Sequence, residues 1–446
     1  MKSSANYPLR KCGIYRNLPD FDPSIQGLNA IICGANGISG FATLRALLDA
    51  PERWACIYTL SRSPLSKEQM SLIPPALHSH IKHVPIDLSS PGEKIAAVLR
   101  EADVHADYVF FYSYIQPADT GDSGMSVSMA DALYELNVPL FKNFLQGMEI
   151  AELEPKRVVL QTGGKNYGVH IGRTRTPFVE SDPQPRHLQP NFYYAQEDLL
   201  FQYCQKHPGT GWNVIRPVAI IGVAQRAPLN AFYPFGIYAA VQAQKQEPLS
   251  FGGDFESWQF EQSHSTARLT AYLSEWAALE DECKNQAFNA QDGGMLNWDR
   301  FFVELARWFG VDKGVQNPDP EEARLRIQTF AGGKDGPLGY GPPTALKTTF
   351  RLADWFQQPE NKVAWEQIMA NSNGHVKVNV FEDPAMKTII SEFDYARRGN
   401  LSMNKARRMG FCGFVETLES LHEMYKETGD FGALPSMKVA GANPLI

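Results

Sequence analysis

A glycine-rich turn is the first feature of this sequence that could do chemistry. The string Gly34-Ala35-Asn36-Gly37-Ile38-Ser39-Gly40 lies between a short apolar run and a stretch with helical spacing. Glycines let the backbone approach a pyrophosphate, and the N-terminus of a helix attracts its negative charge. The spacing is GxxGxxG rather than GxGxxG, but the same chemistry applies. We therefore predict that a dinucleotide is bound through Gly34, Asn36, Gly37, Ile38 and Gly40.

The end of the next apolar run indicates which dinucleotide this is. It ends in Thr59-Leu60-Ser61-Arg62-Ser63, without a carboxylate that could bind the ribose 2′-hydroxyl of NAD. A guanidinium can bind a 2′-phosphate through two hydrogen bonds, and the Ser63 hydroxyl can donate another. We therefore expect NADP(H), bound by Arg62 and Ser63. The alternative is that Arg62 is a solvated loop residue.

Two residues after the third apolar run are placed to meet the adenine. Asp87 and Leu88 follow that run directly, and we expect the Asp87 carboxylate to accept from the adenine amino group. The alternative is an Asx-type turn in which Asp87 caps the backbone of Ser89-Ser90-Pro91.

These residues depend on a regular alternation of apolar runs and helix-like stretches. Runs at 29–33, 56–60, 81–86, 108–112, 157–161 and 212–216 alternate with helix-like segments such as 92–102, 126–136 and 194–205. Continuous apolar runs of this kind are typical of parallel strands that are covered on both faces. The sequence therefore predicts an α/β fold, a Rossmann-type doubly wound parallel sheet, over residues 28–225.

The remaining segments are different in character. Residues 1–27 are polar and aperiodic, and we expect an N-terminal arm outside the core. Residues 226–446 are expected to form a smaller, mainly helical substrate-binding region, with helices at 265–280, 298–308, 354–369 and 414–427. The Gly/Pro-rich insertion at 312–348 is either a lid or a surface insertion. A set of aromatic residues is either core or the wall of an apolar pocket: Phe232, Tyr233, Phe235, Tyr238, Phe251 and Trp258.

Composition excludes several classes of protein. The 446 residues are 43% hydrophobic and 20% charged, with a formal net charge of −7 and no basic footprint of a nucleic-acid binder. No apolar run approaches the length of a membrane span. The six scattered cysteines have no metal-ligand spacing and read as reduced thiols. Without an apolar leader at the N-terminus, we expect a cytoplasmic protein with no membrane association and no metal.

Two strings near the middle of the chain resemble a known family. These are Gln161-Thr162-Gly163-Gly164-Lys165-Asn166-Tyr167 and Asn191-Phe192-Tyr193-Tyr194-Ala195-Gln196-Glu197-Asp198. They resemble the progesterone 5β-reductase/iridoid synthase (PRISE) family of atypical short-chain dehydrogenases/reductases. The resemblance continues at 108–114, 212–217, 286–289 and 403–414, so that it extends from residue 28 to about residue 430.

The resemblance implies a catalytic pair and a reaction. Ordinary short-chain dehydrogenases have a lysine four residues after the catalytic tyrosine, but Glu197 stands there in this sequence. In the PRISE family the lysine lies after the fifth strand, which assigns catalysis to Tyr193 and Lys165, with Tyr194 packed behind Tyr193. The implied reaction is NADPH-dependent reduction of a carbon–carbon double bond conjugated to a carbonyl. The alternatives are carbonyl reduction, epimerisation or dehydration at the same site, or a catalytically inactive nucleotide-binding scaffold.

Further contacts follow from the same resemblance. We expect Ser113, Gln161, Tyr193 and Ile220 to line the cofactor site, and Tyr114 to contact the substrate in place of the family's tryptophan. A small hydrophobic carbonyl compound, such as a specialised metabolite, suits this family. Its members are often dimers, so a homodimer is compatible with the resemblance.

Overall fold

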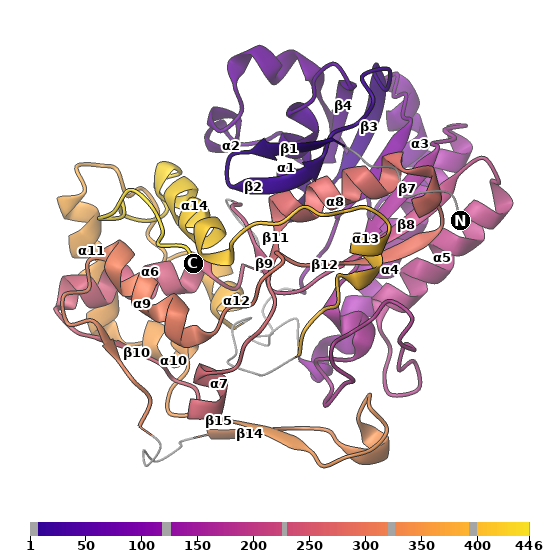
Figure 1. Ribbon diagram of the computed structural model, residues 1–446. Helices are drawn as coiled ribbons and strands as arrows, with labels where there is room; N and C mark the ends of the chain where they lie inside the picture. Colours follow the sequence, from indigo (N-terminus) through magenta and orange to yellow (C-terminus); the bar gives the residue numbers. More distant parts are fainter. Residues whose placement is uncertain (1–7, 118–125, 225–229, 320–325, 392–398, 446) are drawn as a thin grey trace.

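A seven-stranded parallel sheet, in the right-hand part of Figure 1, is the main sheet of the described residues. The computed structural model describes residues 8–117, 126–224, 230–319, 326–391 and 399–445. In their order across the sheet, the strands are β12 (Gln286–Ala290), β8 (Gly211–Pro217), β7 (Arg157–Gln161), β6 (Tyr108–Phe111), β3 (Leu28–Cys33), β4 (Trp54–Ser61) and β5 (Ile81–Pro85). The predicted Rossmann-type fold is confirmed.

Helices cover both faces of this sheet. Ile32 of β3 packs into a core with α1 (Ile38–Leu48) and α8 (Ala267–Leu279). Its neighbour Ile31 packs into a second core on the other face. The helices there are α3 (Gly92–Glu101), α4 (Ala130–Ile150) and α5 (Phe192–Lys206). Burial on both faces explains why these strands are continuously apolar in the sequence.

The strand order places a ligand site at one point of the sheet. β3 pairs with β4 on one side and with β6 on the other, so the chain reverses direction across the sheet here. In open parallel sheets, ligands bind outside the carboxyl ends of the strands at such a switch point. The glycine-rich turn begins at the carboxyl end of β3 and is therefore at this position.

The sheet takes one strand from beyond residue 225, where the Rossmann-type part was predicted to end. β12 pairs in parallel with β8 and comes from the region expected to be mainly helical. Helix α8, which covers the sheet, also comes from that region. Gln286–Ala290 has only five residues and follows a long helical stretch, so its period gave no sign of a strand.

The expected N-terminal arm outside the core is wrong, because part of this segment is folded against the core. The strands β1 (Leu9–Cys12) and β2 (Tyr15–Pro19) form an antiparallel hairpin. Its Tyr15 and Leu18 side chains are buried in the same core as α8. Arg16 also bonds Glu419 of α14 (Thr417–Asp430) through Nη2 and Oε1 at 2.8 Å. The hairpin was missed because two short strands give little periodicity.

Most of the C-terminal helices gather beside the sheet, on the left of Figure 1, whereas α8 and α13 (Asn404–Arg408) lie against the sheet itself. The aromatic set is buried in the common core of the helices beside the sheet, except for Tyr233, which is partly buried and packs against it; this favours the core interpretation of Phe232, Phe235, Tyr238, Phe251 and Trp258. The predicted helices at 265–280, 298–308 and 414–427 are present, whereas the one at 354–369 is two helices that meet near Pro359. The helices of this region, besides α8, α13 and α14, are α6 (Tyr233–Lys245), α7 (Phe255–Trp258), α9 (Trp298–Phe309), α10 (Leu352–Phe356), α11 (Pro359–Asn371) and α12 (Ala385–Ser391).

The Gly/Pro-rich insertion contains a second hairpin, formed by β14 (Arg326–Phe330) and β15 (Thr344–Thr348). Beyond β14, the backbone N–H of Ala331 donates to the carbonyl of Ile171 at 3.0 Å, and that of Arg173 donates back to Ala331 at 3.2 Å. The insertion therefore joins the C-terminal region to the loop that follows Lys165.

The described residues also contain several short elements. These are α2 (Lys67–Ser71), β9 (Ile220–Ile221), β10 (Leu249–Ser250), β11 (Ser265–Thr266), β13 (Val315–Gln316) and five 3₁₀ turns: Pro75–His80, Val127–Met129, Gly164–Tyr167, Asp281–Cys283 and Gly333–Asp335. Within the described ranges, no helix combines the length and apolarity needed to cross a bilayer.

Candidate active site

The three glycines of the turn meet different surroundings. Gly34 has a φ of +80°, which favours glycine, and a Cβ there would lie 3.0 Å from the backbone nitrogen of Ser113. A Cβ on Gly40 would lie only 2.3 Å from the Gly34 carbonyl oxygen, so Gly40 allows α1 to pack against the turn. A Cβ on Gly37 would have that same oxygen as its nearest described neighbour, at 3.4 Å. Gly37 therefore faces the open side of the turn.

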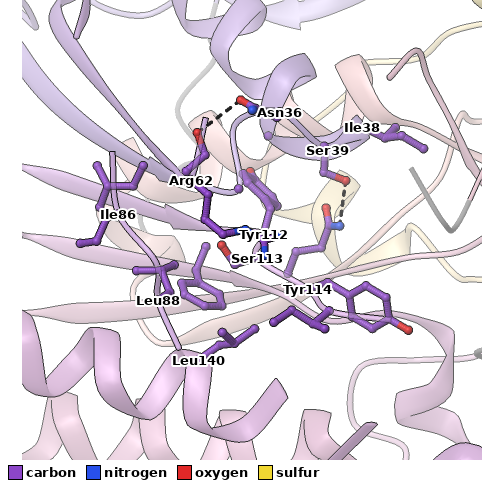
Figure 2. Close-up of a pocket in the computed structure, with 18 of the residues that line it drawn as sticks. Asn36, Ile38, Ser39, Arg62, Ile86, Leu88, Tyr112, Ser113, Tyr114 and Leu140 are labelled. Carbon is purple, nitrogen blue, oxygen red and sulfur yellow. Dashed lines mark hydrogen bonds between the residues drawn. The ribbon is translucent and has the colours of Figure 1, made fainter. Parts of the chain in front are cut away.

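A cavity of about 690 Å³ opens beside this turn (Figure 2). Ile86 and Leu88 lie at one end, and Tyr114 lies at the other. The structure places every predicted cofactor and substrate residue on its wall: Gly34, Asn36, Gly37, Ile38, Gly40, Arg62, Ser63, Asp87, Leu88, Ser113, Tyr114, Gln161, Tyr193 and Ile220. Their roles in binding remain predictions.

The loop after β4 is fastened to the glycine turn. Asn36 Nδ2 donates to the backbone oxygen of Ser63 at 2.8 Å, and Gln69 Nε2 donates to the backbone oxygen of Asn36 at 3.2 Å. Ser61 Oγ also donates to the Ser63 oxygen at 2.8 Å. Arg62 is exposed at the rim of the cavity. The loop thus presents a guanidinium beside the turn that is expected to bind the pyrophosphate.

Asp87 adopts the Asx turn that the sequence left as an alternative. Its Oδ1 accepts from the backbone N–H of Ser89 at 3.0 Å and from the Ser89 hydroxyl at 2.8 Å. These bonds stabilise the carboxylate and lower the pKa of Asp87. The residue also lines the cavity, so the turn holds an ionised carboxylate at the end where adenine is expected.

Two buried polar atoms at the end of β7 lack a partner among the described residues. Gln161 donates through Nε2 to the Ser39 hydroxyl at 2.8 Å, but its Oε1 has no such partner, and neither does the Thr162 hydroxyl. Both residues line the cavity. Burying a polar atom without a hydrogen bond is costly, so these atoms fit a ligand that supplies the missing groups. A dinucleotide, with its ribose hydroxyls and carboxamide, has such groups.

Tyr193 lies at the start of α5, on the wall of the cavity. Asn191 caps the helix, because its side chain accepts from the Tyr193 backbone N–H at 3.0 Å. A Cβ on Gly163 would lie 3.4 Å from the Tyr193 hydroxyl, so the phenol approaches the loop that follows β7. The Tyr193 ring contacts Phe192, which in turn contacts Tyr114. An aromatic surface therefore continues from the phenol toward the expected substrate end.

Lys165 lies on the 3₁₀ turn Gly164–Tyr167, and its side chain is half-buried. Asn191 Nδ2 donates to its backbone oxygen at 2.9 Å, which joins the lysine turn to the start of α5. Among the residues that the structure describes, Tyr193 lines the cavity and Lys165 does not. The structure thus brings the tyrosine helix and the lysine turn into contact through Asn191.

Tyr194 is packed behind this contact, as predicted. Its side chain is buried, and its hydroxyl donates to the backbone oxygen of Asn166 at 3.1 Å. Burial raises the pKa of Tyr194 to about 12, so this phenol remains protonated near neutral pH. Tyr194 therefore supports the lysine turn rather than facing the cavity.

Several residues on the cavity wall were missed by the sequence analysis. Ser39 lies inside the glycine turn and could have been recognised from that position. Thr162, Phe192 and Gln196 lie inside the two strings that resemble the family, so their positions could also have indicated them. Residues such as Ile115 and Leu140 carry no signal of their own, because only the fold brings them to the wall.

The sheet order, the glycine turn and the cavity at the switch point define a Rossmann fold. UDP-glucose 4-epimerase from Stenotrophomonas maltophila shares this fold. The two have a TM-score of 0.50 and 14% identity over 66% of this chain and 87% of that one. A family model described as a PRISE-like Rossmann-fold domain matches residues 30–330, and the chain belongs to that family.

Relatives of this chain occur in fungi and plants. Short chain dehydrogenase gsfE of Penicillium aethiopicum is 27% identical over 91% of this chain and 99% of its own. (S)-8-oxocitronellyl enol synthase ISY2 of Nepeta racemosa is 30% identical over 69% of this chain and 74% of its own. 3-Oxo-Delta(4,5)-steroid 5-beta-reductase of Arabidopsis thaliana is 28% identical over 64% and 70%, respectively. These relatives confirm the resemblance that the strings around Lys165 and Tyr193 indicated.

Proposed function

We propose that this protein is an NADPH-dependent reductase of carbon–carbon double bonds conjugated to a carbonyl. The observation that carries the proposal is the Tyr193 phenol on the cavity wall, with its helix bonded through Asn191 to the turn that bears Lys165. The names of two relatives, an oxocitronellyl enol synthase and a steroid 5-beta-reductase, support this class of reaction.

The proposed cofactor is NADP(H). Arg62 and the Ser63 hydroxyl would hold the 2′-phosphate, on a loop that Asn36 fixes against the glycine turn. Gln161 Oε1 and the Thr162 hydroxyl would supply an acceptor and a hydroxyl at the nicotinamide end. When bound, the reduced nicotinamide supplies the hydride that adds to the β-carbon of the substrate.

The protein's part in the reaction is to stabilise the charge that develops on the carbonyl oxygen. The Tyr193 hydroxyl donates a hydrogen bond to this oxygen as it becomes an enolate, which is typically the largest contribution to such catalysis. The Lys165 ammonium lowers the pKa of the phenol and adds positive charge nearby. Both roles require the carbonyl to lie at the same end of the cavity as Tyr193.

The proposed substrate is a small hydrophobic carbonyl compound. Tyr114 and Phe192 form an aromatic surface beside Tyr193, their ring centroids 6.0 Å apart. Such a surface favours apolar groups near the carbonyl.

The proposed location is the cytoplasm. The free thiols of all six cysteines, each in a described part of the chain, suit this location.

The test is NADPH oxidation with a panel of enals and enones, followed by product analysis. A saturated carbonyl product is expected, whereas an allylic alcohol would show carbonyl reduction instead. Tyr193→Phe removes the donor and keeps the ring, so kcat should fall about 100-fold or more while NADPH binding persists. If full turnover survives in Tyr193→Phe, another group is the acid and the proposal is wrong.

A further inference from the structure

Glu197 occupies the helix position at which ordinary short-chain dehydrogenases have their lysine, and it is buried in an ion pair. Arg216 of β8 donates through Nη2 to both carboxylate oxygens of Glu197, at 3.1 and 3.0 Å. The two side chains are only 3% and 6% exposed. A lysine at position 197 would bring a second cation against the Arg216 guanidinium in a buried place, where like charges repel strongly. The ion pair therefore excludes the usual location of the lysine.

One glutamine connects this ion pair to the lysine turn. Gln184 Nε2 donates to Glu197 Oε2 at 2.9 Å and to Asn166 Oδ1 at 2.8 Å. Asn166 is fully buried and directly follows Lys165. The Glu197 carboxylate and the lysine turn are thus separated by a single side chain.

The other bonds of the turn hold its backbone and its end. Asn191 donates to the Lys165 carbonyl, and the Tyr194 hydroxyl donates to the Asn166 carbonyl. Tyr167 donates from its hydroxyl to Asn289 Oδ1 at 2.6 Å, and its ring stacks on Phe178. Gln184 supplies the bond to the Asn166 side chain and bonds Glu197 directly. The ion pair also meets the end of the turn, because the Arg216 guanidinium lies over the Tyr167 ring, 5.7 Å from its centroid.

A lysine on a short 3₁₀ turn needs such support. On a long helix, a lysine one turn after the tyrosine has its direction fixed by the helix itself. A turn of four residues has no comparable regularity, so its direction depends on the contacts made by its neighbours.

We infer that Glu197, held by Arg216, is a positioning residue that acts through Gln184 and Asn166 to keep Lys165 directed at Tyr193. This inference rests on the proposed function, because it assigns a task to the catalytic pair. The relocation of the lysine and the glutamate at position 197 are then two parts of one arrangement.

The test uses Gln184→Met, which preserves the length of the side chain and removes its hydrogen bonds. Gln184 is half-buried and lies outside the ion pair, so the variant should fold. If Lys165 loses its direction, the pKa of the Tyr193 phenol rises. We expect kcat to fall about tenfold with the KM for NADPH within about twofold, and the alkaline limb of the kcat profile to move to higher pH.

The phenol can also be titrated without any substrate. Tyrosinate absorbance near 295 nm is recorded against pH, and the signal of Tyr193 is the difference between a protein and its Tyr193→Phe counterpart. Gln184→Met should shift this titration upward by about half a unit or more, because the stabilising ammonium is less well placed. Gln202→Met, at an exposed glutamine of α5, is the control and should change neither readout.

A second variant examines the carboxylate itself. Glu197→Gln keeps an acceptor for Gln184 and Arg216 but removes the charge, so it should retain more activity than Glu197→Met. Equal kcat, pH profile and phenol titration in Gln184→Met and wild type would overturn the inference. A loss of melting temperature and activity without any pH shift would also overturn it, by indicating a structural role. An inactive wild type whose phenol titration still responds to Gln184→Met would instead refute the proposed function.

Discussion

The second and third glycines of the turn are expected to differ when each is replaced by alanine. The sequence pattern treats Gly37 and Gly40 alike, but the structure does not. A methyl group on Gly40 would lie 2.3 Å from the Gly34 carbonyl oxygen and 2.9 Å from the Ala35 Cα. A methyl group on Gly37 would lie 3.4 Å from that oxygen, and its extended backbone, with φ at −81°, suits any residue.

The distances give the size of each effect. An ordinary contact is about 3.5 Å, so Gly40→Ala must separate the turn from α1 by about 1 Å, and both contacts are with backbone atoms that cannot rotate away. Overpacking of this kind typically costs about 1–3 kcal/mol. This corresponds to a lowering of the melting temperature by several degrees. Gly37→Ala should leave stability unchanged and occupy the space through which a phosphate approaches the backbone.

The assay combines melting of the protein alone with NADPH titration followed by fluorescence. Gly40→Ala should lower the melting temperature and weaken NADPH binding together. Gly37→Ala should weaken binding about tenfold or more, or about 1.4 kcal/mol, with the melting temperature within ~1 °C of wild type. The reasoning is refuted if the Gly40 variant melts like wild type, or if both variants lose the same stability.

Three further outcomes follow from single side chains. Arg62→Ala should weaken NADPH binding about ten- to 100-fold and leave NADH binding unchanged, measured by titration with each cofactor; equal losses would contradict NADP(H) preference. Leu18→Ala should cost about 2–5 kcal/mol in urea unfolding, because Leu18 is fully buried, whereas Leu9→Ala in the same hairpin, 56% exposed, is the neutral control. Burial raises the pKa of Asp292 to about 7, so the folded protein holds a proton that the unfolded chain loses near pH 4. This contribution to stability is therefore lost as pH rises from about 4 to 7. The melting temperature of wild type should fall between pH 5.5 and 8, and that of Asp292→Asn should fall less. An equal fall in both proteins would mean that other groups cause it.

The sequence predicts the parts of this protein whose patterns are local. Each of the six predicted strands is a continuous apolar run, because both faces of the strand are buried under helices. The glycine turn is equally local, since its backbone conformation and its position between strand and helix are readable from neighbouring residues.

What could not be predicted depends on contacts between distant segments. β12 is a strand because β8 offers it an edge, and the hairpin at β1 and β2 is ordered because α8 and α14 cover it. The strings that hold Tyr193 and Lys165 were recognised by resemblance. Their contact through Asn191, and the support from Gln184, required the fold to bring residues 165, 184 and 191 together.

The late position of β12 in the chain has a consequence for synthesis on the ribosome. Until residue 290 has left the exit tunnel, β8 has no neighbour on its outer side and presents unpaired N–H and C=O groups to solvent. A nascent chain that is stalled or cut near residue 225 would therefore end with an open sheet edge, which is a template for association with other unfinished chains. A truncated chain that is meant to contain the complete sheet needs to extend through residue 290.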